Sequence, residues 1–132
     1  MTQTIGVVGL GVMGSAMAGN LLKAGFAVEG YDIAPKARAA LRRIGGRPAS
    51  AVSKLKAPVL ITSLPSAQAL HEVATAMRGK PIVLETSTLP IEEKERARAS
   101  LARKGITLLD CPLSGTGAQA RARAELSEVI DG

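Results

Sequence analysis

Three glycines near the start of the chain restrict its fold more than any other feature. Gly9, Gly11 and Gly14 form the pattern G-x-G-x-x-G. They follow residues 4–8, a short apolar run that is typical of a strand buried on both faces of a parallel sheet. Glycines at this spacing allow a tight turn into a helix, close approach of the backbone to a phosphate, and close packing of helix on strand. The pattern therefore predicts a dinucleotide-binding strand, turn and helix.

Short apolar runs alternate with segments of helical period along the rest of the chain. The predicted strands are residues 4–8, 26–31, 47–49, 59–62, 82–84 and 106–109, and the predicted helices begin near Met13, Pro35, Ser66 and Pro90. Repeated alternation of strand and helix favours a parallel sheet with helices on both faces. We therefore expect an α/β fold, a Rossmann-type doubly wound and mainly parallel sheet, in a single domain over residues 1–132.

Two of these segments are less regular than the others. Residues 47–49 form only a short candidate strand, and Pro48 restricts it to a sheet edge or a strand start. The helix from Pro35 ends at two glycines. Its apolar residues are predicted to lie on one face: Ala37, Ala40, Leu41 and Ile44.

The second predicted strand leads into an acidic residue. Asp32 lies 18 residues after Gly14, close to the spacing at which a carboxylate binds the adenosine ribose hydroxyls of a dinucleotide. A carboxylate there would repel a 2′-phosphate, so the sequence favours NAD over NADP. Lys36 and Arg38 follow closely and keep NADP open as the less favoured cofactor.

Polar or tightly turned segments follow three later strands as well. They are residues 64–66, residues 85–88 and residues 110–117. Serine and proline after a strand are ordinary turn and helix-cap residues when taken singly. Because ligands of open parallel sheets bind beyond the carboxyl ends of the strands, their shared edge favours a functional interpretation.

The charge and composition exclude several other functions. The chain carries 17 basic and 11 acidic residues, a net charge of +6, which would suit a nucleic acid. Only Phe26 and Tyr31 could stack on bases, however, and the basic residues are spread along the chain, so we expect no nucleic-acid partner. No apolar run is long enough to span a membrane, and we expect a cytoplasmic location.

Two side chains with reactive groups are expected to have structural rather than catalytic roles. Cys111 is the only cysteine, so it cannot form an internal disulfide, and we expect it to be a small buried hydrophobe. His71 is the only histidine and is expected on the surface or in a helix cap rather than in catalysis. We expect no metal site.

The glycine-rich segment resembles the start of a known family. Residues 9–14 read Gly-Leu-Gly-Val-Met-Gly, Met17 and Ala18 follow, and residues 20–25 read Asn-Leu-Leu-Lys-Ala-Gly. Together they resemble the β-hydroxyacid dehydrogenases, which include 3-hydroxyisobutyrate and 6-phosphogluconate dehydrogenases. Residues 64–65, 87–88 and 110–115 resemble later segments of the same family, in the same order.

This resemblance implies roles for individual residues. The implied cofactor-binding residues are Gly9, Leu10, Gly11, Val12, Met13, Gly14, Asp32, Leu64, Pro65 and Thr88. Residues 110–115 resemble a substrate-binding D-x-P-x-S-G loop, in which Ser114 and Gly115 would bind the substrate carboxylate. Thr116, counted with this loop, stands where the family usually has a second glycine.

The resemblance also implies a missing part. Family members continue into an all-helical domain that carries the motif G-x-x-G-x-G-x-x-x-K, whose lysine is the general acid and base. None of the seven lysines of this chain stands in such a motif, so the resemblance places the catalytic lysine beyond Gly132. The cofactor domain is accordingly expected to be incomplete at its C-terminal end.

The implied function is the NAD-dependent conversion of a small 3-hydroxy acid to a semialdehyde or ketone. With no catalytic residue within these 132 residues, we expect little activity from them alone. The helical domain, or an oligomer, would be the partner of the chain. The alternative function is a noncatalytic NAD(H)-binding or partner-binding module.

Overall fold

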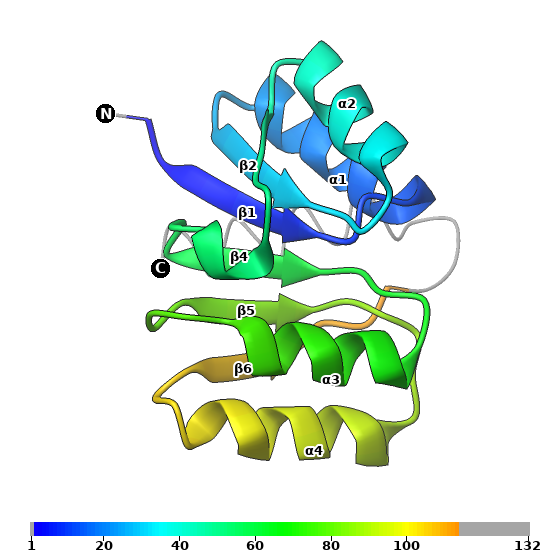
Figure 1. The fold of residues 1–132 in the computed structure, drawn as a ribbon, viewed down its shortest axis with the longest axis vertical. Coiled ribbons are helices and arrows are strands. Elements are labelled where there is room, and N and C mark those ends of the chain that lie inside the picture. Colours follow the sequence, from blue (N-terminus) through cyan, green and yellow to red (C-terminus); the bar gives the residue numbers. More distant parts are fainter. Residues whose placement is uncertain (1, 114–132) are drawn as a thin grey trace.

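Six parallel strands form one sheet in the computed structural model, which describes residues 2–113 (Figure 1). The strands are β1 (Thr4–Val8), β2 (Ala27–Tyr31), β3 (Arg47–Pro48), β4 (Val59–Thr62), β5 (Ile82–Glu85) and β6 (Thr107–Asp110). Their order across the sheet is β3-β2-β1-β4-β5-β6. The helices are α1 (Val12–Lys23), α2 (Pro35–Arg43), α3 (Ala67–Ala76) and α4 (Ile91–Ala102), with a 3₁₀ helix, η1 (Val52–Lys54), before β4.

Two predictions lie outside the described residues. The first is the substrate loop at Ser114, Gly115 and Thr116. The second is the catalytic lysine, which the family resemblance places beyond Gly132 and therefore outside both the described residues and the sequence itself. Both stay predictions.

Side chains of β1 alternate between two hydrophobic cores. Ile5 and Val7 pack in the core that contains Met17 of α1. Val8 packs in the opposite core, with Leu70 of α3. Full burial of each of these side chains contributes about 1.5–3 kcal/mol. The helices therefore cover both faces of the sheet, which confirms the predicted doubly wound fold. Within residues 2–113, no helix is long and apolar enough to cross a membrane.

The apolar face predicted for α2 is only partly buried. Only Leu41 is buried among the residues of this helix, whereas Ala40 and Ile44 are exposed. The helix ends at Arg43 because the Gly46 N–H donates to the Leu41 carbonyl at 3.0 Å, the closing hydrogen bond of a Schellman motif. This early end places Ile44 outside the helix, 52% exposed.

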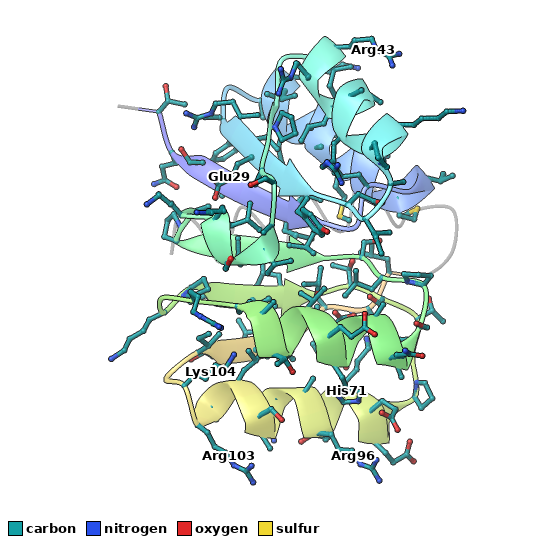
Figure 2. The ribbon with its side chains drawn as sticks, in the orientation of Figure 1. Glu29, Arg43, His71, Arg96, Arg103 and Lys104 are labelled. Carbon is teal, nitrogen blue, oxygen red and sulfur yellow. The ribbon has the colours of Figure 1, made fainter. Side chains whose placement is uncertain are left out.

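The segment between β2 and β4 is shaped by one glutamate. Glu29 accepts hydrogen bonds from the backbone N–H groups of Lys56 and Ala57 at 2.6 and 2.7 Å. This side chain points from β2 toward that segment in Figure 2. It fixes the chain between η1 and β4, for which the sequence predicts no element. The strand before it, β3, is two residues long and lies at the sheet edge, as Pro48 predicts.

Side-chain hydrogen bonds stabilise both ends of α3. The Ser66 hydroxyl accepts a hydrogen bond from the Ala69 N–H at 3.1 Å and caps the start of the helix, as predicted. At the other end, Lys104 Nζ donates to the carbonyls of Ala74 and Thr75 at 2.8 and 2.7 Å (Figure 2). These contacts hold α3 beside α4 and so fix the start of α3 near the carboxyl ends of the strands.

An ion pair also joins α3 to α4. His71 Nε2 lies 2.6 Å from Glu93 Oε2, and Figure 2 shows His71 between the two helices. The hydrogen bond with His71 lowers the pKa of Glu93 below its ordinary value of 4.5. Burial opposes this effect in part, and the charge of Arg96 adds a smaller lowering. His71 therefore occupies a structural, partly exposed position.

This pair predicts a pH dependence of stability. Because the pKa of Glu93 is lower in the folded chain, the stability that its carboxylate contributes is present above about pH 4.5 and is lost as the pH falls through the lowered pKa. Glu93→Gln should therefore reduce the loss of stability between about pH 5 and about pH 3, measured by urea unfolding. Glu95→Gln, which removes a solvent-exposed i,i+3 pair with Arg98, is the matched control. An equal acid dependence in Glu93→Gln and the parent would contradict the prediction.

Candidate dinucleotide-binding site

A cavity of about 650 Å³ lies beyond the carboxyl ends of β1, β2 and β4. Its volume falls in the range of small-molecule and cofactor sites. From β1 the strand order runs to β2 and β3 on one side and to β4, β5 and β6 on the other. Open α/β sheets bind their ligands at the point where the strand order reverses in this way. The lining residues are Val8, Gly9, Gly11, Val12, Met13, Tyr31, Asp32, Ile33, Ala51, Val52, Ser63, Leu64, Pro65, Ala69, Glu72, Val73 and Ala76.

Two of the three motif glycines are required by the packing of the turn between β1 and α1. Gly9 has a φ of +93°, and a Cβ there would lie 2.0 Å from the carbonyl oxygen of Ser63. A Cβ at Gly14 would lie 1.8 Å from the carbonyl oxygen of Gly9. Neither position can hold a side chain without moving the backbone. The glycines therefore let α1 start directly against β1 and β4.

Gly11 has a different role from the other two glycines. A Cβ at this position would meet no atom within 4 Å, and Gly11 lines the cavity. The packing of the chain therefore does not require glycine here. An open backbone at this point suits close approach of a pyrophosphate.

The start of α1 carries no side-chain cap. Gly11 is the N-cap residue, no side chain accepts from the first turn, and that turn contains no acidic residue. Val12, the first residue of the helix, is 88% exposed. The N–H groups of this turn and the positive end of the helix dipole are therefore available to an anion in the cavity.

Asp32 is held at the rim of the cavity by backbone donors. Its Oδ2 accepts a hydrogen bond from the Leu10 N–H at 2.7 Å, and its Oδ1 accepts one from the Ala34 N–H at 2.8 Å. Each carboxylate oxygen can accept more than one hydrogen bond, so capacity for two ribose hydroxyls remains. The carboxylate is thereby oriented beside the glycine turn, as the sequence spacing predicts.

Arg38 supports this rim without reaching the carboxylate. Its guanidinium donates to the backbone carbonyl of Asp32 at 2.7 Å and lies 5.8 Å from the ring centroid of Tyr31. The negative charge of Asp32 is therefore not paired with Arg38.

Apolar walls beside Asp32 were not predicted from the sequence. Ile33 is 83% exposed at the rim, and Val52 of η1 and Val73 of α3 line the cavity with it. Apolar side chains at this place suit the faces of a flat aromatic ring such as adenine. Val73 lies on a face of α3 that its helical period indicates, whereas the sequence gives no signal for η1.

The predicted cofactor residues divide into three groups. Gly9, Gly11, Val12, Met13, Asp32, Leu64 and Pro65 line the cavity. Leu10 and Gly14 support it from the core, where Leu10 is 4% exposed and its N–H binds Asp32. Thr88 is exposed and does not line the cavity, so its role stays a prediction.

The described residues show no catalytic group in the cavity beyond two carboxylates. Asp32 and Glu72 are the ionisable residues that line it, apart from Tyr31, and none of the lining residues is a lysine.

Cys111 is partly buried against the core of α1 and α2, less completely than expected. Within residues 2–113, no group of His, Cys, Asp and Glu could hold a metal ion. This part of the chain is equipped to bind a dinucleotide.

Comparisons with known proteins agree with this geometry. A family model described as the NAD binding domain of 6-phosphogluconate dehydrogenase matches residues 4–129. The chain is 36% identical to 3-hydroxyisobutyrate dehydrogenase of Pseudomonas aeruginosa, over 97% of this chain and 46% of that protein. It is 33% identical to L-threonate dehydrogenase of Cupriavidus necator, over 100% of this chain and 47% of that protein.

A solved structure extends the similarity to the fold. The structure of 3-hydroxyisobutyrate dehydrogenase of Mycobacterium tuberculosis with L-serine matches with a TM-score of 0.79 and 32% identity, over 91% of this chain and 44% of that one. The chain thus spans about half the length of the curated relatives it matches. The chain belongs to the β-hydroxyacid dehydrogenase family, and residues 4–129 match the NAD-binding domain of that family.

Proposed function

We propose that this chain binds NAD in the cavity beside β1 and is the cofactor-binding part of a dehydrogenase that acts on a small 3-hydroxy acid. The observation that carries the proposal is the uncapped start of α1, which faces the same cavity as Asp32. A helix N-terminus and a carboxylate beside one cavity suit the pyrophosphate and the adenosine ribose of a dinucleotide.

The residues present fit the cofactor. Gly11 and the first turn of α1 would hold the pyrophosphate, because a Cβ at Gly11 would meet nothing and no side chain caps that turn. Asp32 would bind the adenosine ribose, and Ile33 and Val73 would line the space for the adenine. Leu64 and Pro65 would contact the other half of the dinucleotide. When bound, the cofactor would supply the group that accepts a hydride from the substrate carbon.

The nature of the substrate follows from the relatives. Their names give 3-hydroxyisobutyrate and L-threonate as substrates, and both are small acids with a hydroxyl group near the carboxylate. We extend this class to the present chain. Ser114, Gly115 and Thr116 are the proposed carboxylate-binding residues.

The proton that leaves the hydroxyl group needs an acceptor, for which the cavity offers only the carboxylates of Asp32 and Glu72. General acid and base catalysis contributes about 10² to 10⁴ in rate. None of the cavity-lining residues is a lysine, and Lys94 is only 4% exposed and bound to Asp110. We propose that the acid and base group is supplied from beyond Gly132, as the family resemblance implies. A noncatalytic NAD(H)-binding module is the second candidate, because it needs no such group.

The preference for NAD over NADP is part of the proposal. An unpaired carboxylate at Asp32 would repel the 2′-phosphate of NADP. Arg38 donates to the backbone carbonyls of Asp32 and Ile33 through Nη1 alone, so its other N–H groups keep NADP open as the less favoured cofactor.

Replacement of Asp32 tests this preference. Asp32→Asn keeps the shape of the side chain and removes its charge, so the affinity for NAD⁺ should fall and the repulsion of NADP⁺ should end. The ratio of the two dissociation constants, measured by calorimetry, should move toward unity by about tenfold. Lys80→Met, a charge change at an exposed residue before β5 that does not line the cavity, is the control and should leave the ratio within about twofold. A ratio unchanged in Asp32→Asn would remove this residue from cofactor selection.

Two glycine variants separate binding from folding. Gly14→Ala should lower the free energy of unfolding by about 1–3 kcal/mol because its Cβ meets the Gly9 carbonyl. Gly11→Ala should change stability by less than about 1 kcal/mol and weaken NAD⁺ binding about tenfold or more, because the methyl group occupies the phosphate position. Urea unfolding and calorimetric titration measure the two effects. Parent-like NAD⁺ affinity in Gly11→Ala would contradict the proposed site.

An activity assay distinguishes the two candidate functions. Purified residues 1–132, mixed with NAD⁺ and 3-hydroxyisobutyrate or threonate, should produce no NADH above the rate without protein, as judged by absorbance. Turnover by this chain would show that the acid and base group lies within it. Turnover restored by adding the helical domain of a relative would favour the dehydrogenase over the noncatalytic module.

A further inference from the structure

Three neighbouring strands end in polar residues that lie in one row. The register pairs Thr62 of β4 with Glu85 of β5, and Glu85 with Asp110 of β6. Thr62 and Glu85 are both fully buried, with 0% exposure. A carboxylate in such a place is costly unless hydrogen bonds and an opposite charge compensate it. The row therefore needs partners from other elements.

Lys94 of α4 supplies the opposite charge. Its Nζ lies 2.7 Å from Asp110 Oδ1 and 4.0 Å from Glu85 Oε1. Lys94 is itself only 4% exposed. Because the ammonium is held between two carboxylates, it anchors Glu85 at the base of the loop that follows β5.

Glu85 in turn holds the chain on both sides of it. Its Oε2 accepts a hydrogen bond from the Thr62 hydroxyl, and its Oε1 accepts one from the Ser87 N–H at 2.5 Å. Ser87 is 4% exposed, so it has little access to water. This contact fixes the turn from β5 into residues 86–88.

Ser87 in turn fixes the loop after β4. Its Oγ accepts a hydrogen bond from the Leu64 N–H at 2.7 Å. Leu64 and Pro65 line the dinucleotide cavity, whereas Ser87 and Glu85 do not. Hydrogen bonds thus connect the buried Glu85, through Ser87, to Leu64 in the wall of the cavity.

The strand order shows which half of the ligand this wall meets. Asp32 follows β2 on one side of β1, and Leu64 follows β4 on the other side. In a doubly wound sheet a dinucleotide spans the two sides, with its pyrophosphate at the turn after β1. If Asp32 binds the adenosine ribose, the wall at Leu64 meets the nicotinamide half.

We infer that Ser87 and Glu85 are positioning residues for the nicotinamide half of the cofactor: Glu85 fixes Ser87, and the Ser87 hydroxyl fixes the loop of Leu64 and Pro65. The inference rests on the proposed function, because it takes the orientation of NAD from Asp32. It predicts that the loss of the Ser87 hydroxyl weakens binding of the nicotinamide half and spares the adenosine half.

The test compares two ligands and two variants. NAD⁺ contains both halves, and ADP-ribose lacks the nicotinamide. Ser87→Ala should weaken NAD⁺ binding by about tenfold and ADP-ribose binding by less than about twofold, measured by calorimetry on the 132-residue chain. Thr86→Val is the matched control, since Thr86 is similarly buried and its hydroxyl donates to the Thr62 carbonyl without touching Ser87 or Leu64. It should leave the ratio of the two affinities unchanged.

Glu85 variants test the first step of the chain of contacts. The amide of Glu85→Gln can accept from the Ser87 N–H and donate to the Thr62 hydroxyl, so this variant should keep the parent ratio. Glu85→Leu can make neither hydrogen bond, so it should shift the ratio of the NAD⁺ and ADP-ribose affinities in the same direction as Ser87→Ala. If Glu85→Leu does not fold, the comparison of Ser87→Ala with Thr86→Val decides the matter.

The outcomes separate this inference from the proposed function. If the parent chain binds neither NAD⁺ nor ADP-ribose, the proposed function is overturned and the inference with it. If the parent binds both and Ser87→Ala weakens both equally, or neither, only the positioning role is overturned. A ratio that shifts equally in Ser87→Ala and Thr86→Val would also overturn that role, because loss of any buried hydroxyl would then suffice.

Discussion

Close contact between the glycine turn and the ends of the neighbouring strands determines the rest of the site. Gly9 leaves no room for a side chain beside Ser63, and Gly14 leaves none beside Gly9. This contact starts α1 at the level where β2 and β4 end. It brings the Leu10 N–H to Asp32 and leaves the first turn of the helix open to the cavity. Without it, the phosphate-binding groups and the ribose-binding carboxylate would not face one space.

The two sides of the cavity are stabilised by different means. On the β2 side, apolar side chains and one oriented carboxylate form the wall, and the backbone donors that hold the carboxylate come from nearby turns. On the β4 side, the wall depends on a buried lysine and glutamate beneath it. In the part of the chain that the structure describes, every buried side-chain polar atom has a partner. Removal of one partner from such a network costs more than the network itself contributes, which makes the β4 side sensitive to single substitutions.

The sequence is sufficient to predict those parts of the molecule that depend on local pattern. The buried strand at residues 4–8, the glycine turn and the acidic end of β2 all have signatures within residues 4–32, and the structure confirms the fold they predict. The walls depend on tertiary contacts instead. Val52 lines the cavity from a 3₁₀ helix, and Glu29 of β2 fixes the chain that follows this helix. Ser87 binds the Leu64 N–H although the two residues are 23 positions apart in the sequence. Neither contact has a local pattern. The two glycines after α2 predict where that helix ends, but the exposure of Ile44 follows from the Schellman turn, which places it just outside the helix.

A crystal structure of the chain with NAD⁺ tests the central claim most directly. We expect pyrophosphate oxygens against the N–H groups at the start of α1 and both adenosine ribose hydroxyls on the Asp32 carboxylate. We expect the nicotinamide beyond β1, against Leu64 and Pro65. Cofactor bound elsewhere, or an adenosine ribose on the β4 side of the turn, would contradict this claim.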